Sequence, residues 1–450
     1  MTTTSFKMRR HSFASLFLAS ILSVVVFNSC QRGETAFNQK HKLSYYSSDV
    51  LDKWMTMQLR LMRNATGIAN HAFSRHFAYA GVAAFESLRP GLTGPARQWS
   101  DKWNGLTGLP DFNHGKKYYY PANVNAAMAA LNKAMFPNAS AADKIAIDSL
   151  KAAFEQEFLD DQTESIITTS SDFGKAVATA IFNWAETDGY KNANSPYTVP
   201  TGQGLWKPTP PAFANPATPY WGNNRTIITG STNNAQPGSS LPYSTAPESS
   251  FYTMVKEVYD ASLVLTNDQK AMAMFWRDVP GVSSPGHWLS ILQQVVKQTG
   301  SGLDKAALAY ALTGTAINDA LIACFEAKYE KSLVRPITYI REVMGHTTWN
   351  SFLGTPAHPE YSSAHSSLSI AAARVIDEIF GNVGSFTDHT YDYLGLTPRT
   401  YPSMTAIGVE AGRSRFYAGI HYNPGIDAGI LQGNKVAENI FNTIGTQILK

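Results

Sequence analysis

The amino-acid sequence predicts an all-α protein made of packed helical bundles with one long irregular excursion. Apolar residues recur at helical spacing from Asp49 onward, and we find no sustained alternation of apolar and polar residues that would indicate strands. The 450 residues include 44% hydrophobic and 16% charged side chains, which is typical of a globular protein with a buried core. We therefore expect residues 49–450 to form a single all-α domain.

The first 29 residues have the features of an export signal. A basic start precedes an apolar run from Phe13 to Phe27, which is too short to span a membrane securely. Cys30 follows directly, as the lipid-acceptor cysteine of a bacterial lipoprotein would. We expect a signal peptide over 1–29 and a polar tether over 30–48, on an exported lipoprotein of the periplasm, outer membrane or cell surface. An ordinary signal peptide with an incidental cysteine is the alternative.

Net charge narrows the class of partner. Removal of residues 1–29 takes away Lys7, Arg9 and Arg10 and no acid, which leaves 34 basic side chains of the original 37 against 34 acidic ones. A neutral total argues against nucleic acid as a partner, and against a membrane contact other than the lipid anchor. If Cys30 is acylated, Cys324 is the one remaining cysteine, so no internal disulfide can form. Cys324 lies in an apolar helical run, where we expect a buried structural thiol.

Helical patterns dominate both halves of the chain. In the N-terminal half they cover 49–62, 71–88, 123–136, 140–159 and 171–186, and Ser140 is a suitable helix cap. In the C-terminal half they cover 250–265, 268–277, 303–334, 366–380, 405–420 and 427–449. Residues 303–334 predict a long buried helix that ends near Arg335, because Pro336 disfavours helical geometry in the residue before it. The last four helices predict a C-terminal bundle over about residues 300–450.

Residues 189–249 differ from the rest of the chain. Pro, Gly, Asn and Ser dominate this stretch, and Trp206, Tyr220 and Trp221 are scattered among them. An excursion of this length within a compact domain is uncommon and is usually functional or disordered. The aromatic residues favour an ordered loop that lies over the helices as a lid, and a disordered segment is the alternative.

Cations, a hydroxyl and imidazoles recur in three short motifs near predicted helix ends. The motifs are Lys328 with Arg335-Pro336, then Ser363-Ala364-His365, then Ser414-Arg415 with His421. Each has an ordinary explanation: two solvated charges, a serine cap and a core histidine. Lys328 and Arg335, however, are two helical turns apart and share a face, and a helix N-terminus after Ser363 is an anion site. Arg415 and His421 would reach a common pocket from one helix. Together the motifs predict a cage for a multiply charged tetrahedral oxyanion.

These motifs match the three-part signature shared by vanadium-dependent haloperoxidases and type 2 phosphatidic acid phosphatases. The chain resembles the bacterial haloperoxidases more closely, through the sequence Pro-Ala-His-Pro-Glu-Tyr-Ser-Ser-Ala-His-Ser at 356–366 and through 275–288, which ends Pro-Gly-His-Trp. The resemblance extends from about Asp49 to the C-terminus.

The resemblance implies a vanadate cofactor, with hydrogen peroxide and a halide as substrates. It implies that the neutral imidazole of His421 binds vanadium. It assigns the vanadate oxygens to Lys328, Arg335, Arg415, Ser363 and the amide of Ala364. His365 would be the acid–base, and Lys328 would polarise bound peroxide so that a halide attacks it and leaves as hypohalous acid. Iodide is the expected halide. The family often forms homo-oligomers.

Two further residues carry weaker expectations from the resemblance. His358 falls where related bromoperoxidases have a second histidine near the halide, which keeps bromide open as a substrate. Phe325 falls where an aromatic ring often lines that pocket, and a purely structural role is the alternative.

The chain departs from the family pattern at two positions. Ala364 stands where many members have glycine, and its amide can still donate if the backbone needs no positive φ. Gly425 stands where the family usually has an aspartate that orients the metal-binding histidine. We expect Asp427 to reach back in its place, or else to cap the last helix. Without such a partner, metal affinity or activity typically falls about 10–100-fold.

Two other functions remain open on sequence alone. An acid phosphatase could use the same cage, with His421 as nucleophile and His365 as general acid. A non-catalytic surface lipoprotein could bind glycans or another ligand through 189–249.

Overall fold

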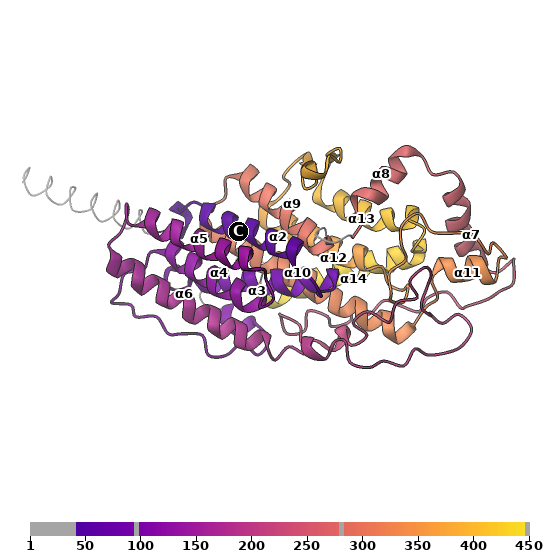
Figure 1. The fold of residues 1–450 in the computed structure, drawn as a ribbon, viewed down its shortest axis with the longest axis horizontal. Coiled ribbons are helices and arrows are strands. Elements are labelled where there is room, and N and C mark those ends of the chain that lie inside the picture. The colour runs from indigo at the N-terminus through magenta and orange to yellow at the C-terminus, as the bar shows by residue number, and fades with distance from the viewer. Residues whose placement is uncertain (1–41, 94–98, 279–282, 446–450) are drawn as a thin grey trace, which may run out of the picture.

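The computed structural model describes residues 42–93, 99–278 and 283–445. The predicted signal peptide, Cys30 and the tether up to residue 41 lie outside the described residues. Within them, thirteen α-helices account for almost all regular structure, which confirms the all-α class (Figure 1). One antiparallel hairpin, not foreseen in the sequence, pairs β1 (Phe386–Asp388) with β2 (Arg399–Tyr401).

The first five helices pack at one end of the elongated molecule in Figure 1. They are α2 (Asp49–Asn64), α3 (Phe73–Glu86), α4 (Tyr120–Met135), α5 (Ala141–Phe158) and α6 (Glu164–Ala185). Ser140 caps α5, because its side chain accepts from the Asp143 amide. Short 3-10 helices are η1 (Leu43–Tyr45), η2 (Asn70–Ala72) and η3 (Arg89–Gly91), and, further along the chain, η5 (Tyr190–Asn192), η6 (Trp221–Asn223) and η7 (Asp392–Leu394).

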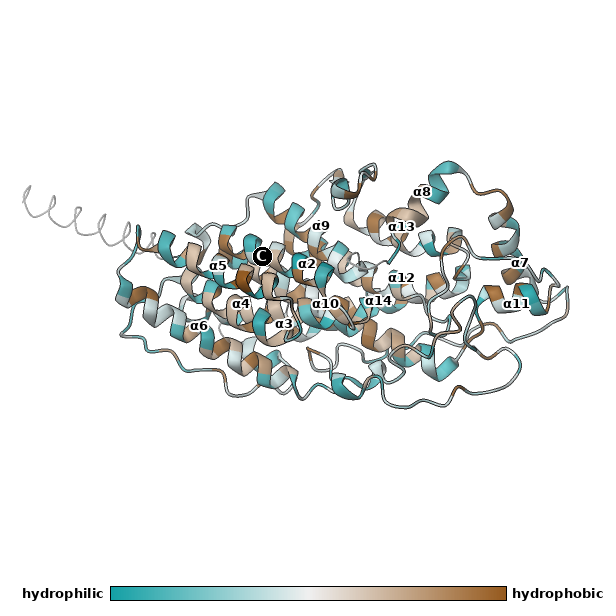
Figure 2. Ribbon diagram, in the orientation of Figure 1, coloured by the Kyte–Doolittle hydropathy of each residue, from teal (hydrophilic) through white to brown (hydrophobic). Residues whose placement is uncertain are grey.

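The remaining helices form the middle and the other end of the molecule (Figure 1). They are α7 (Ser250–Leu263), α8 (Asn267–Phe275), α9 (Ser284–Thr299), α10 (Leu303–Lys331), α11 (Pro336–Glu342), α12 (Ala364–Phe380), α13 (Met404–Tyr417) and α14 (Asn423–Ile444). Helix α12 packs against α10, α13 and α14, so its N-terminus is surrounded by the ends of other helices. The hydrophilic first half of α8 lies at the periphery (Figure 2).

Helix α10 is the central element and contacts both α3 and α12. It is long and apolar enough to cross a membrane, but its apolar window is completely buried in the fold, as in the core helix of a globular domain. Helix α3 approaches α10 closely at Gly81, where a Cβ would lie 2.4 Å from the Tyr310 carbonyl oxygen. The 29-residue helix thereby joins the two ends of the molecule and brings its C-terminal residues to the bundle of α12, α13 and α14.

Several predicted helix boundaries were wrong, and three of them bear on the site. Helix α10 ends at Lys331, because Ser332 adopts a left-handed conformation with φ of 45°. Helix α13 ends at Tyr417 and Gly419 follows with φ of 77°, so Arg415 and His421 do not share a helix. Helix α14 begins at Asn423 with a proline in its first turn, so Asp427 lies inside the helix and does not cap it.

The excursion over 189–249 packs on the helices and contains two 3-10 turns and no longer element. Trp206 and Trp221 are buried. The amide of Trp206 donates to the Ser332 carbonyl (2.7 Å), which attaches the excursion to the end of α10. Asp319, in the middle of α10, accepts from the amides of residues 227 and 228 and from the Ser231 hydroxyl. The excursion therefore forms part of the wall around the C-terminal half of α10.

Candidate active site

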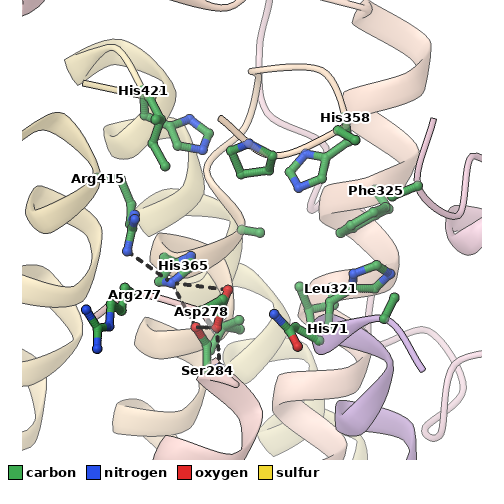
Figure 3. A pocket seen from close by; sticks show the side chains of 18 of the residues that line it. His71, Arg277, Asp278, Ser284, Leu321, Phe325, His358, His365, Arg415 and His421 are labelled. Atoms are coloured by element: carbon green, nitrogen blue, oxygen red, sulfur yellow. Dashed lines mark hydrogen bonds and ion pairs between the residues drawn. The ribbon is translucent and has the colours of Figure 1, made fainter. Parts of the chain in front are cut away.

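A cavity of about 390 Å³ lies where the C-terminal half of α10 meets the N-terminus of α12. Figure 3 shows His365, Arg415 and His421 on one side of it, and His71, Leu321 and Phe325 on the other. Residues from α10, α12, α13 and the segment before α14 therefore converge on one hollow, and the second and third motifs contribute Ala364, His365, Arg415 and His421 to its lining.

Two buried cations lie behind this cavity. Lys328 and Arg335 are both 0% exposed. The Lys328 Nζ donates to the carbonyl oxygens of Pro359 (3.0 Å) and Glu360 (2.9 Å), and Arg335 donates to those of His358 (2.9 Å) and Ile420 (2.7 Å). Burial lowers the pKa of Lys328 to about 8 and that of Arg335 to about 10. The ammonium is therefore charged at neutral pH and held by uncharged carbonyl groups.

Arg415 is the third cation and lies on the cavity wall. Its Nη1 donates to the Trp276 carbonyl, and its Nε is buried with no hydrogen-bond partner among the described residues. A buried N–H without an acceptor carries a free-energy penalty of about 1–3 kcal/mol. An oxyanion in the cavity would supply that acceptor, so the donor set fits the anion that the sequence predicts.

His421 presents one ring nitrogen to the cations. Its Nδ1 lies 2.7 Å from the Glu360 Oε1, and its Nε2 lies 3.1 Å from the Arg335 Nη1. Because a carboxylate accepts and a guanidinium donates, this network assigns the proton to Nδ1 and a lone pair to Nε2. Burial, with the charges of Arg335 and Lys328, holds the pKa of His421 well below its usual value. The imidazole is neutral, as a metal ligand must be.

Asp427 does not contact His421, so the expected orienting role falls to a different residue. The Asp427 carboxylate accepts from Arg413 (2.7 Å) on an exposed face of α14. Glu360 pairs with His421 instead, and sequence reasoning did not single it out. The signal was present: Glu360 lies within the segment 356–366, and Gly425 leaves His421 without the carboxylate that the family usually supplies.

The second motif, Ser363-Ala364-His365, lies at the N-terminus of α12. Ser363 caps this helix, with its Oγ 3.4 Å from the Ser366 amide, so its hydroxyl proton remains available for a ligand. Ala364 and His365 line the cavity in the first turn, where backbone amides have no partner within the helix. Ala364 has no positive φ, so the substitution of alanine for glycine leaves its amide able to donate.

His365 is held by the segment before α9. Its Nε2 lies 3.0 Å from the Trp276 carbonyl and 2.8 Å from the Ser284 Oγ, and 3.6 Å from a carboxylate oxygen of Asp278. The Arg415 Nη1 also lies 3.4 Å from Nε2, but the shorter contacts are to the Trp276 carbonyl, which can only accept, and to the Ser284 hydroxyl, which donates to Asp278. These contacts assign the proton to Nε2 and a lone pair to Nδ1. Burial and the charge of Arg415 hold the pKa of His365 well below its usual value, so the ring is a neutral base. Sequence reasoning assigned no role to Asp278 or Ser284.

An aromatic wall stands across the cavity from His365 and Arg415 (Figure 3). The His358 Nδ1 lies 3.0 Å from the Arg335 Nη2 and 3.3 Å from the Pro359 carbonyl, and the shorter contact, with a group that can only donate, assigns the proton to Nε2. The His358 ring lies 5.2 Å from that of Phe325, which in turn lies 4.3 Å from that of His71. The His71 Nε2 contacts the Thr218 Oγ1 at 2.6 Å, so the excursion supports this wall. His71 was missed in the sequence because it belongs to none of the three motifs.

Comparison with known proteins agrees with this geometry. Residues 308–448 match the sequence model of a protein family described as the VCPO second helical-bundle domain. The structure is similar to that of a bacterial vanadium-dependent iodoperoxidase, with 30% sequence identity, a TM-score of 0.79, and coverage of 88% of this chain and 96% of that one. No functionally curated protein sequence matches.

Two other solved structures share the fold. An apo and a holo form of bacterial vanadium-dependent chloroperoxidase have TM-scores of 0.63 and 0.60, with 17% and 18% identity. Each covers 84% of this chain, and the chain covers 96% and 94% of theirs. Identity at this level shows the fold alone. The identity and coverage of the iodoperoxidase, with the helical-bundle match, show that the chain belongs to the vanadium-dependent haloperoxidases, enzymes that act with peroxide.

Proposed function

We propose that the protein is a vanadate-dependent haloperoxidase that oxidises iodide, with bromide as the second candidate, to hypohalous acid. The observation that carries the proposal is the set of three buried cations around a neutral His421 whose Nε2 lone pair faces the Arg335 guanidinium. Iodide is favoured because the 30% identical structure is that of an iodoperoxidase. In the overall reaction, hydrogen peroxide, a halide and one proton give hypohalous acid and water, and two electrons pass from halide to peroxide.

The chain offers a complete set of groups for vanadate. His421 would bind vanadium through Nε2, and the oxygens would meet Lys328, Arg335, Arg415, the Ser363 hydroxyl and the Ala364 amide. When bound, vanadate supplies a Lewis-acidic centre that makes hydrogen peroxide open to attack by a halide. The unpartnered Arg415 Nε and the excess of buried positive charge support this fit.

The remaining roles follow from the protonation states of the side chains. The lone pair on the His365 Nδ1 takes a proton from hydrogen peroxide as it enters, and the Nε2–H stays engaged with the Trp276 carbonyl. Lys328 holds positive charge behind the reacting oxygens, where burial strengthens its field. The His358 Nε2–H and the edge of Phe325 offer a site for a halide on the opposite wall.

A direct assay tests the proposal. Purified protein is incubated with vanadate, hydrogen peroxide and iodide or bromide, and the oxidised halide is measured against a His421→Ala control. We expect iodide oxidation that depends on vanadate and is lost in the control. Equal rates in both proteins would contradict the proposal. Phosphate-ester hydrolysis that vanadate inhibits, without halide oxidation, would instead establish the phosphatase.

We further propose that the enzyme works outside the cytoplasm on a lipid anchor at Cys30. The basic start, the apolar run and the cysteine at its end support this. In cells that make the full chain, we expect the protein in the membrane fraction, and Cys30→Ser should move it to a soluble exported fraction. Equal partitioning of both proteins would contradict the anchor.

A further inference from the structure

Glu360 is fixed at both its backbone and its side chain. Its amide donates to the Leu333 carbonyl (3.0 Å), and its carbonyl accepts from the Lys328 Nζ (2.9 Å). The residue is 0% exposed. A glutamate held in this way brings its carboxylate to one place, next to the Nδ1 of His421.

Two donors converge on one oxygen of this carboxylate. The Glu360 Oε1 accepts from the His421 Nδ1 (2.7 Å) and from the Tyr422 backbone amide (3.1 Å). The backbone amide can only donate, so it requires an acceptor at this point regardless of the state of the imidazole. An acceptor held there favours the tautomer of His421 with its proton on Nδ1.

Gly425 supplies the space that the carboxylate occupies. A Cβ at this position would lie 2.4 Å from the Glu360 Oε1 and 2.8 Å from its Oε2, distances that real side chains do not tolerate. Gly425 lies in α14 and has no positive φ, so its backbone conformation does not require glycine. The reason for glycine here is the room that it leaves for Glu360.

We propose that Glu360 and Gly425 act as one unit that sets the tautomer of His421, with Glu360 as the positioning residue and Gly425 as the gap that admits it. The inference deepens the proposed function, since it explains how His421 keeps its Nε2 lone pair directed at the oxyanion. Carboxylate partners of metal-binding histidines typically change affinity about 10–100-fold.

The first test measures the tautomer of His421 directly. Nitrogen-15 NMR of histidine-labelled, vanadate-free protein should show a protonated Nδ1 in the native enzyme and a mixture of tautomers in Glu360→Ala. Glu360→Gln should keep the native tautomer, because the Tyr422 amide holds the amide oxygen of the new side chain toward the ring. Asp427→Asn, at a carboxylate that pairs with Arg413 instead, is the matched control and should change nothing.

The second test uses a double-mutant cycle on vanadate affinity, measured by calorimetry. Gly425→Ala should weaken binding about 10–100-fold in the native background, because the added methyl group displaces the carboxylate. The same substitution should cost nothing further in Glu360→Ala, where there is no carboxylate to displace. Glu360→Ala combined with Gly425→Asp should recover part of the affinity, since a side chain at 425 points at the vacated space.

Unfolding alone cannot produce this pattern. Gly425→Ala should lower the melting temperature of the protein no more than Glu360→Ala does, because both remove the same buried hydrogen bonds to the Tyr422 amide and the His421 Nδ1, and affinities are compared at a temperature where every variant is folded. The proposal is overturned if His421 keeps its Nδ1 proton in Glu360→Ala, or if the costs of the two single substitutions add in the double variant. A native enzyme that binds vanadate without oxidising halide would refute the proposed function, and the NMR comparison would still decide this inference.

Discussion

The two ends of the molecule treat buried charge in opposite ways. Near the first bundle, the buried Arg75 forms an ion pair with Asp188, which also accepts from Tyr79. Around the cavity, Lys328, Arg335 and Arg415 are equally buried, yet in the described residues none of them lies within 4.0 Å of a carboxylate oxygen. Carbonyl oxygens and a histidine make the direct contacts, and the carboxylates of Glu360 and Asp278 act on these cations only at longer range.

The difference separates a charge that maintains the fold from charges that await a ligand. An unpaired buried charge destabilises a protein, because desolvation is not offset by attraction. A cluster of such charges persists where an oxyanion supplies the missing partner on binding. A cluster of buried cations with no carboxylate oxygen within 4.0 Å is therefore a more specific sign of an anion-binding site than burial or positive charge alone.

The largest effect on stability should come from the paired charge. Asp188→Ala leaves Arg75 buried without its partner, which should lower the free energy of unfolding by about 3–5 kcal/mol. Chemical denaturation measures this loss. Iodide oxidation per folded molecule should stay unchanged, because this pair does not line the cavity. If Asp188→Ala lowers the free energy of unfolding by less than about 1 kcal/mol, the proposed difference between the paired and unpaired cations is wrong.

The unpaired charge should show the reverse pattern. Arg335→Met removes a donor that faces the His421 Nε2 and should lower halide oxidation about 10²–10³-fold. Stability without vanadate should fall by less than in Asp188→Ala, because the loss of hydrogen bonds to carbonyl oxygens and imidazoles is offset by the removal of a buried cation that has no carboxylate of the described residues within 4.0 Å. Thermal unfolding and initial rates on the same preparations measure both quantities. A marked fall in melting temperature would mean that Arg335, like Arg75, mainly maintains the fold.

The pH dependence of anion binding sharpens the comparison further. The pKa of Lys328 is about 8, below its usual 10.5, because the ammonium is buried. Affinity for sulfate, whose charge is constant over this range, should fall up to about tenfold per pH unit above pH 8 as the ammonium loses its proton. Stability of the anion-free protein should rise between pH 8 and 10.5, since the unfolded chain binds the extra proton there. Lys328→Met should flatten both trends.

The smallest effect should come from an exposed pair. Asp427→Asn breaks the ion pair with Arg413, whose side chains are 56% and 38% exposed. Solvent screening limits such pairs to about 0–1 kcal/mol, and halide oxidation should not change. Denaturant titration with a rate measurement checks this. A substantial loss of activity would indicate that Asp427 does contribute to the active site.

Sequence reasoning reached the fold class because apolar spacing and helix caps are local signals. It also selected Lys328, Arg335, Ser363, His365, Arg415 and His421, which the structure gathers at or directly behind one cavity. The order of the motifs was enough to predict that these residues lie together. It could not predict the tautomers of His365 and His421, because each tautomer depends on hydrogen-bond partners that are distant in sequence.

The errors have physical causes. The end of α13 was extended past Gly419, although a glycine there signals a left-handed helix stop. Asp427 was chosen because it is near His421 in sequence, whereas Glu360 reaches it from 61 residues away. The hairpin of β1 and β2 was missed because three-residue strands are too short for a periodic pattern.

The hold of Asp319 on the excursion has a consequence for laboratory evolution. This carboxylate clamps residues 227–231 to α10, and the amide of Arg225 donates to the Asp188 carbonyl just before the clamp (2.7 Å). The stretch upstream places Ala217 on the cavity lining and is itself attached to the end of α10 through Trp206. A variant stretch that keeps these attachments can therefore change the cavity lining while the ends of the stretch stay in place. Replacing this stretch with the corresponding residues of relatives can diversify the side chains that line the cavity. The anion-binding residues near the C-terminal end of α10 should keep their positions.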